Sequence, residues 1–237
     1  LVVHLYGLPV DLTPILELSE EKDLVLIEDC SHAHGARLDG RQVGGFGRLG
    51  AFSLGVVKNL AAYGDAGAVS TNDPRLADTV RFLGTHGQVK KNHHEFYGGN
   101  SRLDELHAAM LRVKLRHLDA RTARRQAIAA RYTDAFGRHV TTPPVDPRRT
   151  HVFHQYVIRT PQRAALQQHL AAQGVESGIH YPSPIHRQPA WRSTWGEVEA
   201  LPVVERVASE ILSLPMHPDL TDAEAARVID GVEGFFA

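Results

Sequence analysis

Two residues in the first quarter of the sequence have side chains suited to cofactor chemistry. Lys58 lies in the largely apolar run Val56–Asn59, and a desolvated lysine amine loses proton affinity and becomes a usable nucleophile. Asp29 follows Glu28 and the apolar run Leu24–Ile27. This predicts a carboxylate at the carboxyl end of a buried strand, the edge where open α/β sheets bind ligands. Taken singly, the lysine also fits a surface residue with an apolar stem and the aspartate a turn or helix cap.

Three further polar residues extend the pair. His32 follows Asp29 by three positions, Ser53 precedes Lys58 by five, and Asn100 follows a pair of glycines. Glycines also crowd around the serine, but no phosphate-loop or dinucleotide fingerprint is present. Pyridoxal phosphate needs an amine for its aldehyde, a carboxylate for its pyridine nitrogen and hydroxyl or amide groups for its phosphate. The set therefore predicts a pyridoxal phosphate site.

Ordered motifs with these residues run along the whole chain. Six segments carry them: Glu28–Ala36, Ala51–Leu60, Gly64–Ala68, Gly99–Leu106, Gly178–Pro182 and Leu212–His217. They closely resemble the DegT/StrS family of sugar aminotransferases. The resemblance implies the fold-type I (aspartate aminotransferase-like) α/β architecture, pyridoxal 5′-phosphate as cofactor, and a homodimer with shared active sites.

The resemblance also implies roles for individual residues. Lys58 matches the lysine that carries the cofactor as a Schiff base, and Asp29 the carboxylate that keeps the pyridine nitrogen protonated. Ser53 matches a phosphate ligand, and Asn100 a phosphate ligand that reaches in from the partner subunit. These matches make the lysine the catalytic residue.

Two other matches concern the substrate loop and a departure from the family. His180 and Tyr181 match a loop near the substrate. His32 stands where the family usually has Gln, near the phenolic oxygen of the cofactor, and a His ring makes a comparable hydrogen bond. The resemblance further implies that the N-terminal third of the family's chain precedes Leu1. On that basis we expect residues 1–237, made alone, to bind the cofactor poorly and to aggregate.

The expected activity is transfer of an amino group from glutamate or glutamine to a keto group, most simply that of a nucleotide-linked keto-deoxysugar. A cyclitol or an amino-aromatic precursor stays open as the ketone because of His32. A non-catalytic regulator that kept the fold is a second alternative. A related dehydratase is disfavoured, since those members replace the lysine with His.

The pattern of apolar residues predicts two domains. Strands at Val2–Leu5, Leu24–Ile27, Gly50–Leu54 and Gly67–Ser70 alternate with helices at Thr13–Glu21 and Pro74–Leu83, which is typical of a largely parallel α/β layer. Leu103, Leu106, Met110 and Val113 then mark one face of a helix that continues towards Phe136, as one long helix or two end to end. A strand at Val152–Arg159 and further helices follow. We expect residues 1–118 to be the C-terminal part of the large domain, and residues 119–237 a connecting helix and a small α+β domain.

Composition excludes several classes of protein. The 26 Lys+Arg balance 27 Asp+Glu, so the chain lacks the basic surface of a nucleic-acid binder. No apolar run approaches the ~20 residues of a membrane span. Cys30 is the single cysteine, which excludes a disulfide framework and fits a cytoplasmic location. Three close histidine pairs lack a completing carboxylate or cysteine, so no metal site is expected.

Overall fold

The computed structural model describes residues 1–237 and divides them into two compact units. Unit 1 comprises residues 1–123 and 146–154, and unit 2 comprises residues 124–145 and 155–237. No helix combines the length and the apolar character that crossing a membrane requires.

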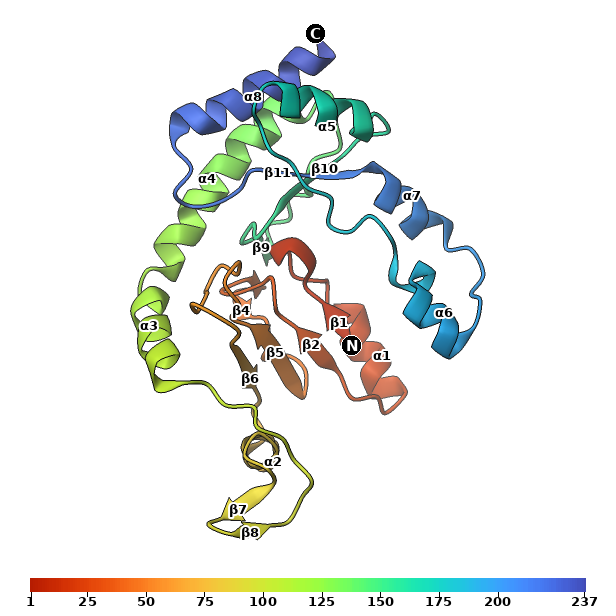
Figure 1. The fold of residues 1–237 in the computed structure, drawn as a ribbon. Coiled ribbons are helices and arrows are strands. Elements are labelled where there is room, and N and C mark those ends of the chain that lie inside the picture. Colours follow the sequence, from red (N-terminus) through yellow and green to blue (C-terminus); the bar gives the residue numbers. More distant parts are fainter. The chain divides into compact units, whose positions relative to one another are not determined.

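A four-stranded sheet forms the centre of unit 1 (Figure 1). Its order is β1 (Val2–Val3), β2 (Ile27–Asp29), β5 (Leu49–Ser53) and β6 (Gly67–Ser70). The first three strands are parallel, as predicted, whereas β6 runs antiparallel to β5. Because the three parallel strands end at one edge of the sheet, residues at the ends of β2 and β5 are brought to the same side.

The strand predicted at Leu24–Ile27 is wrong in position. Leu24 and Val25 are exposed, and β2 begins only at Ile27. The reason is that β1 reaches no further back than the pair Val2–Glu28, while the Leu24 N–H donates to the carbonyl of Ser19 at the end of the preceding helix. The apolar run is thus a connection whose Leu26 alone enters the core.

The two helices predicted in the first part of unit 1 are confirmed. α1 (Thr13–Glu21) packs Ile15 and Leu16 against a core of Leu12, Leu26 and Leu38. A threonine directly before Pro14 predicts Thr13 as the N-cap residue, but the N-cap is Leu12 and Thr13 is the first residue of the helix. α2 (Pro74–Leu83) is capped by the Asp73 carboxylate, which accepts hydrogen bonds from the amides of Arg75 and Leu76. The hairpin of β7 (Gln88–Lys90) and β8 (His93–His94) follows α2.

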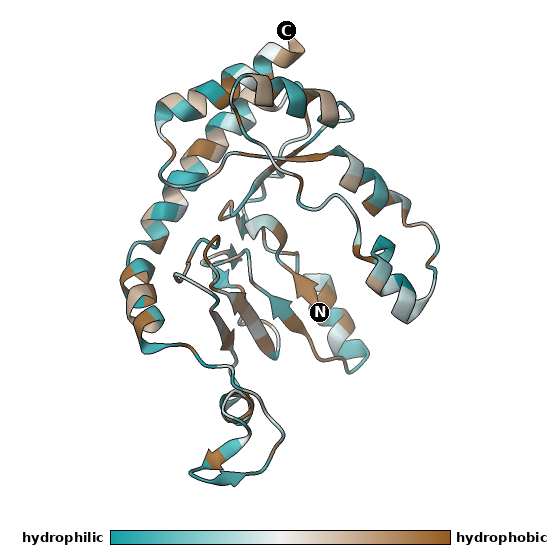
Figure 2. Ribbon diagram, in the orientation of Figure 1, coloured by the Kyte–Doolittle hydropathy of each residue, from teal (hydrophilic) through white to brown (hydrophobic).

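The helical region predicted from Leu103 to Phe136 consists of two helices end to end, one of the two arrangements predicted. They are α3 (Glu105–Leu115) and α4 (Leu118–Phe136). The predicted apolar face of α3 is open to solvent: the exposed fractions of Leu106 and Val113 are 66% and 55%, and Leu111 is the buried residue of this helix. Figure 2 shows the apolar residues along α3.

Unit 2 is built on one antiparallel strand pair, β10 (Tyr156–Arg159) with β11 (Ile211–Leu214). Helices α5 (Arg163–Ala172) and α8 (Asp222–Phe236) pack against each other. The spacing of Thr221 and Glu224 predicts a capping box, and this capping box opens α8. The strand predicted from Val152 begins four residues later, at Tyr156. Val152 belongs to unit 1, where its N–H donates to the carbonyl of Gly7.

The remaining elements are short. A small sheet has the order β4 (Arg41–Gln42), β3 (Arg37–Leu38) and β9 (Arg149–Thr150). Two 3-10 helices, η1 (Leu5–Gly7) and η2 (Ile185–Arg187), and the helices α6 (Pro189–Trp195) and α7 (Pro202–Glu210) complete the chain.

Candidate active site

The carboxylate of Asp29 lies at the carboxyl end of β2, where the sequence predicted it. One oxygen, Oδ1, accepts a hydrogen bond from the Ser31 N–H at 2.9 Å, which fixes the side chain over the turn that follows. No protein donor reaches the other oxygen. Asp29 therefore presents one carboxylate oxygen that a ligand N–H can use.

Lys58 lies in the turn after β5, with its own N–H donating to the Gly55 carbonyl at 2.9 Å. Burial lowers the pKa of the Lys58 amine, and the negative charge of Asp29 acts against this shift. The amine and the carboxylate are thus within electrostatic range of each other. Val56 and Val57 are exposed, so tertiary packing, and not the apolar neighbours in sequence, desolvates the lysine.

Ser53 and Asn100 line one open cavity of about 1020 Å³ in unit 1. Ser53 is the last residue of β5. Asn100, which follows the β7–β8 hairpin, forms an isolated antiparallel β-bridge with Thr85. The Nε of Arg102, which lines the same cavity, donates to Oδ1 of Asn100 at 2.8 Å. Because that bond occupies the amide oxygen, the NH2 group of Asn100 is the part left to donate to a ligand.

His32 and His34 follow Asp29 on the same turn, and both are buried. The Nδ1 of His32 accepts a hydrogen bond from the Tyr6 N–H at 3.2 Å, and its ring lies 4.3 Å from the ring of His154. The ring of His34 packs against Phe52. Burial lowers the pKa of His34 to about 4, the backbone of Ser53 acts against this shift, and the charge of Lys58 adds to it, so this ring is neutral at physiological pH.

Sequence reasoning missed the role of Glu28. Its fully buried carboxylate accepts hydrogen bonds from the amides of Gly44, Phe46 and Gly47 at 2.7–2.8 Å and pairs with the Nε2 of His4 at 3.1 Å. Burial would raise the pKa of Glu28, but these hydrogen bonds outweigh it and lower the pKa. An acidic residue inside the strand next to Asp29 was the available signal, because a buried charge needs partners.

The side chains of His4, Glu28 and Cys30 form a buried group of the kind that can ligate a metal. However, the Nδ1 of His4 accepts the Val10 N–H and both oxygens of Glu28 accept amide hydrogens. Desolvation raises the pKa of Cys30 to about 12, which disfavours a thiolate ligand. Hydrogen bonding therefore accounts for this cluster.

His180 and Tyr181 belong to unit 2, whereas the other sequence-predicted site residues belong to unit 1. The Nδ1 of His180 lies 2.9 Å from the hydroxyl of Ser213 in β11, and burial lowers the pKa of the ring. Tyr181 is exposed and packs edge-on against that ring. Both side chains are thus fixed within unit 2.

The donor set of unit 1 fits pyridoxal 5′-phosphate. Lys58 offers an amine of lowered pKa, and Asp29 offers an unpaired oxygen within electrostatic range of that amine. Ser53 and Asn100, which carry a hydroxyl and an amide NH2, line one cavity large enough for a phosphate. An amine, a carboxylate and neutral phosphate donors are what the aldehyde, the pyridine nitrogen and the phosphate require.

Comparison with known proteins gives the same assignment. A dTDP-3-amino-3,4,6-trideoxy-alpha-D-glucose transaminase of Streptomyces venezuelae is 43% identical over 98% of this chain and 62% of its own. A pleiotropic regulatory protein of Geobacillus stearothermophilus is 42% identical over 99% of this chain and 64% of its own.

Solved structures match equally well. The crystal structure of S. venezuelae DesV superposes with a TM-score of 0.95 at 41% identity, over 99% of this chain and 64% of that one. The structure of NtdA from Bacillus subtilis, which holds the cofactor PMP, superposes with a TM-score of 0.89 at 26% identity, over 98% of this chain and 55% of that one.

The chain spans less than two thirds of the length of these relatives. Within that span, the model of the DegT/DnrJ/EryC1/StrS aminotransferase family, whose members depend on pyridoxal phosphate, matches residues 1–233. The chain belongs to the DegT/DnrJ/EryC1/StrS aminotransferase family.

Proposed function

We propose that the protein is a pyridoxal 5′-phosphate-dependent aminotransferase that transfers an amino group from glutamate or glutamine to the keto group of a nucleotide-linked sugar. The observation that carries this proposal is the placement of Lys58, in the turn after β5, beside the neighbouring strand β2 that ends in Asp29. A half-buried amine whose pKa is lowered by desolvation, within electrostatic range of a carboxylate at the sheet edge, is what a cofactor aldehyde and pyridine require.

Each residue has a defined task in this proposal. The bound cofactor supplies the aldehyde that accepts the amino group and a ring that withdraws electrons from the substrate carbon. Asp29 holds a proton on the pyridine nitrogen, and the phosphate is held by Ser53 together with Asn100 of the partner subunit. Lys58 would hold the cofactor through its aldehyde, and its Nζ would take a proton from the α-carbon of the donor and return one to the sugar carbon.

The substrate assignment is supported by the relatives. The S. venezuelae transaminase is named for an amino group at position 3 of a dTDP-linked deoxysugar, so we propose position 3 of a nucleotide-linked keto-deoxysugar for this protein. His180 and Tyr181, held by β11 of unit 2, are proposed to contact that substrate. His32 is proposed to lie near the phenolic oxygen of the cofactor.

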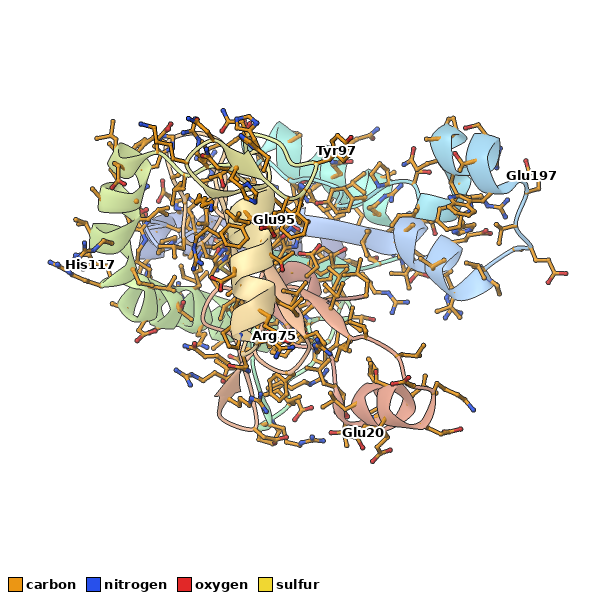
Figure 3. The ribbon with its side chains drawn as sticks, turned by 90° about the horizontal axis from the view of Figure 1, so that it is seen from below. Glu20, Arg75, Glu95, Tyr97, His117 and Glu197 are labelled. Atoms are coloured by element: carbon orange, nitrogen blue, oxygen red, sulfur yellow. The ribbon has the colours of Figure 1, made fainter.

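A homodimer with shared active sites is part of the proposal. The apolar face of α3, with Leu106 and Val113, is exposed. Tyr97, on the loop that follows β8, is fully exposed as well (Figure 3). Exposed apolar side chains on one helix face are typical of a surface that a second subunit covers.

Replacement of Lys58 tests the activity. The Lys58→Ala variant should lose transamination by at least about a thousandfold and should no longer be labelled after treatment with pyridoxal phosphate and borohydride. Lys90→Ala, the matched control at the next lysine along the chain and exposed on β7, should behave as the wild type. Turnover near wild type in Lys58→Ala would end the aminotransferase proposal.

A regulatory protein that kept the fold is the second candidate, and the name of the G. stearothermophilus relative favours it. The two candidates differ in turnover. A wild-type protein that is labelled on Lys58 but aminates no member of a panel of dTDP- and UDP-linked 3-keto sugars would support regulation.

A further inference from the structure

The irregular segment between β9 and β10 contacts the turn that carries Lys58. The Nδ1 of His154 lies 3.2 Å from Oδ1 of Asn59, and Nδ2 of the same amide donates to the carbonyl of Val152 at 3.1 Å. Because the NH2 group faces a carbonyl, the amide oxygen faces the histidine, so His154 Nδ1 carries the hydrogen. Asn59 directly follows Lys58, and this amide is therefore held at two points.

The same histidine contacts the turn that follows Asp29. Its ring lies 4.3 Å from the ring of His32, with 35° between the planes. The His32 ring is held in turn by the Tyr6 N–H, which donates to its Nδ1 at 3.2 Å. One side chain thus bridges the residue after Lys58 and the residue three positions after Asp29.

The backbone around His154 is held in an uncommon conformation. Phe153 has a φ of +44°, in the left-handed region that aromatic residues seldom occupy. Its N–H donates to the Nδ1 of His151 at 3.1 Å, and the two rings stack at 3.8 Å. Burial lowers the pKa of His151 to about 4, which keeps that nitrogen an acceptor at neutral pH.

Gly7 lets this segment approach the His32 turn closely. Its φ is +97°, and a side chain there would meet the His32 carbonyl at 2.9 Å and the Val152 side chain at 2.8 Å. The Gly7 carbonyl also accepts the Val152 N–H at 2.9 Å. A strained residue and a glycine that excludes side chains together place His154, and such strain is found where a fold fixes functional groups.

We propose that His154 is a positioning residue that sets the Lys58 amine relative to Asp29, through its bond to Asn59 and its ring contact with His32. The proposal rests on the proposed function, because only there do the amine and the carboxylate act on one cofactor. The effect proposed for His154 passes through its contacts with Asn59 and His32.

Two substitutions of His154 distinguish the effect of its hydrogen bond to Asn59 from the effect of its ring contact with His32. His154→Phe keeps a ring against His32 and removes the donor to Asn59, whereas His154→Asn keeps a donor near the place of Nδ1 and removes the ring. Asn59→Ala removes the same bond from the other side. His117→Phe, at an exposed histidine that points away from unit 1 (Figure 3), is the matched control.

The readout is the rate at which pyridoxal phosphate, fixed with borohydride, labels Lys58 as a function of pH. Loss of one hydrogen bond predicts labelling about fivefold slower at pH 7.5 in His154→Phe and in Asn59→Ala. The midpoint of labelling against pH should also rise, because a lysine amine that is more exposed to water has a higher pKa. Asp29 continues to favour the charged form of Lys58, and His34 is neutral and does not oppose it. His154→Asn and His117→Phe should keep the wild-type midpoint.

Hydrogen exchange of the 54–62 turn in cofactor-free protein gives a second readout that does not depend on the proposed function. Both donor-removing variants should exchange faster there than the wild type. If His154→Phe does not fold, Asn59→Ala decides by itself. Wild-type exchange and an unchanged midpoint in Asn59→Ala or in folded His154→Phe would overturn the positioning role. A wild-type protein not labelled at Lys58 would instead overturn the proposed function. In that case hydrogen exchange would still test whether His154 holds the turn through Asn59.

Discussion

Two adjacent carboxylates at the end of β2 illustrate how environment divides chemical roles between residues. Both carboxylate oxygens of Glu28 have hydrogen-bond partners, namely three backbone amides and His4, whereas only one oxygen of Asp29 accepts a hydrogen bond, from the turn that follows. A carboxylate whose oxygens are all hydrogen-bonded stabilises the loop that donates to it, and one with an oxygen left over can bind a ligand. The glutamate therefore holds the Gly44–Gly47 loop against the strand that presents the aspartate.

Glu28→Gln should destabilise the protein by about 3 kcal/mol, because an amide NH2 cannot accept the hydrogen bonds that the lost oxygen accepted. The measurement is the free energy of unfolding in urea. Glu17→Gln, at an exposed position of α1, should change it by less than about 0.5 kcal/mol. Equal stability of the two variants would contradict the anchoring role of the buried carboxylate.

His32 gives a second prediction at this scale. His32→Ala removes the acceptor for the Tyr6 N–H and the ring against His154, and should weaken cofactor binding about tenfold. His32→Gln restores the family's usual residue and an acceptor, and should bind within about twofold of the wild type. Titration of pyridoxal phosphate monitored by fluorescence measures both, with His117→Ala as control. Identical dissociation constants for Ala and the wild type would show that the ring does not serve the cofactor.

At the scale of elements, one carboxylate joins α7 to η2. Oε1 of Glu205 in α7 accepts hydrogen bonds from Nε2 of His186 at 3.0 Å and from Nε and Nη2 of Arg187 at 2.8 and 2.6 Å. The hydrogen bond from His186, followed by those from Arg187, lowers the pKa of Glu205 from 4.5 to about 2. One acceptor atom thus ties α7 to η2.

This pKa predicts acid-sensitive order in residues 185–210. Because the folded pKa lies below the unfolded one, the contribution of Glu205 is complete above about pH 4.5 and is lost as the pH falls towards 2. Hydrogen exchange of this segment should accelerate over that window, and Glu205→Gln should remove the pH dependence while exchanging fast throughout. Glu199→Gln, at an exposed position between α6 and α7, should keep the wild-type profile. A wild-type profile flat from pH 5 to 2.5 would contradict the assignment.

At the scale of the whole molecule, the proposed homodimer rests on the exposed face of α3. Leu106 and Val113 lie seven residues apart and hence on one helix face. Each leucine or valine buried in an interface gains roughly 1.5–3 kcal/mol, and a symmetric dimer buries each of them twice. This surface is enough to make association depend on single residues.

Leu106→Lys should therefore weaken the dimer by at least about tenfold in sedimentation velocity at micromolar concentration. Val145→Lys replaces an apolar residue that is 87% exposed in the loop after α4 and should leave association unchanged. Equal dissociation constants for the wild type and Leu106→Lys would show that α3 is not the interface.

The sequence by itself determined the family, the cofactor chemistry and most local structure. α1, α2 and β6 begin and end as predicted, and the capping box of Thr221 forms, because proline positions, caps and apolar spacing act over a few residues. The placement of Asp29 at a strand end followed from the same local pattern.

Tertiary structure decided what depends on distant partners. The apolar run at Leu24 stays outside β2 because no partner strand reaches it, and the exposed valines beside Lys58 do not desolvate the lysine. Asn59 meets His154 across 95 positions, and Glu28 finds its amides 16 to 19 residues away. Such contacts follow from how the chain returns on itself, and residue types within a short window do not encode that return.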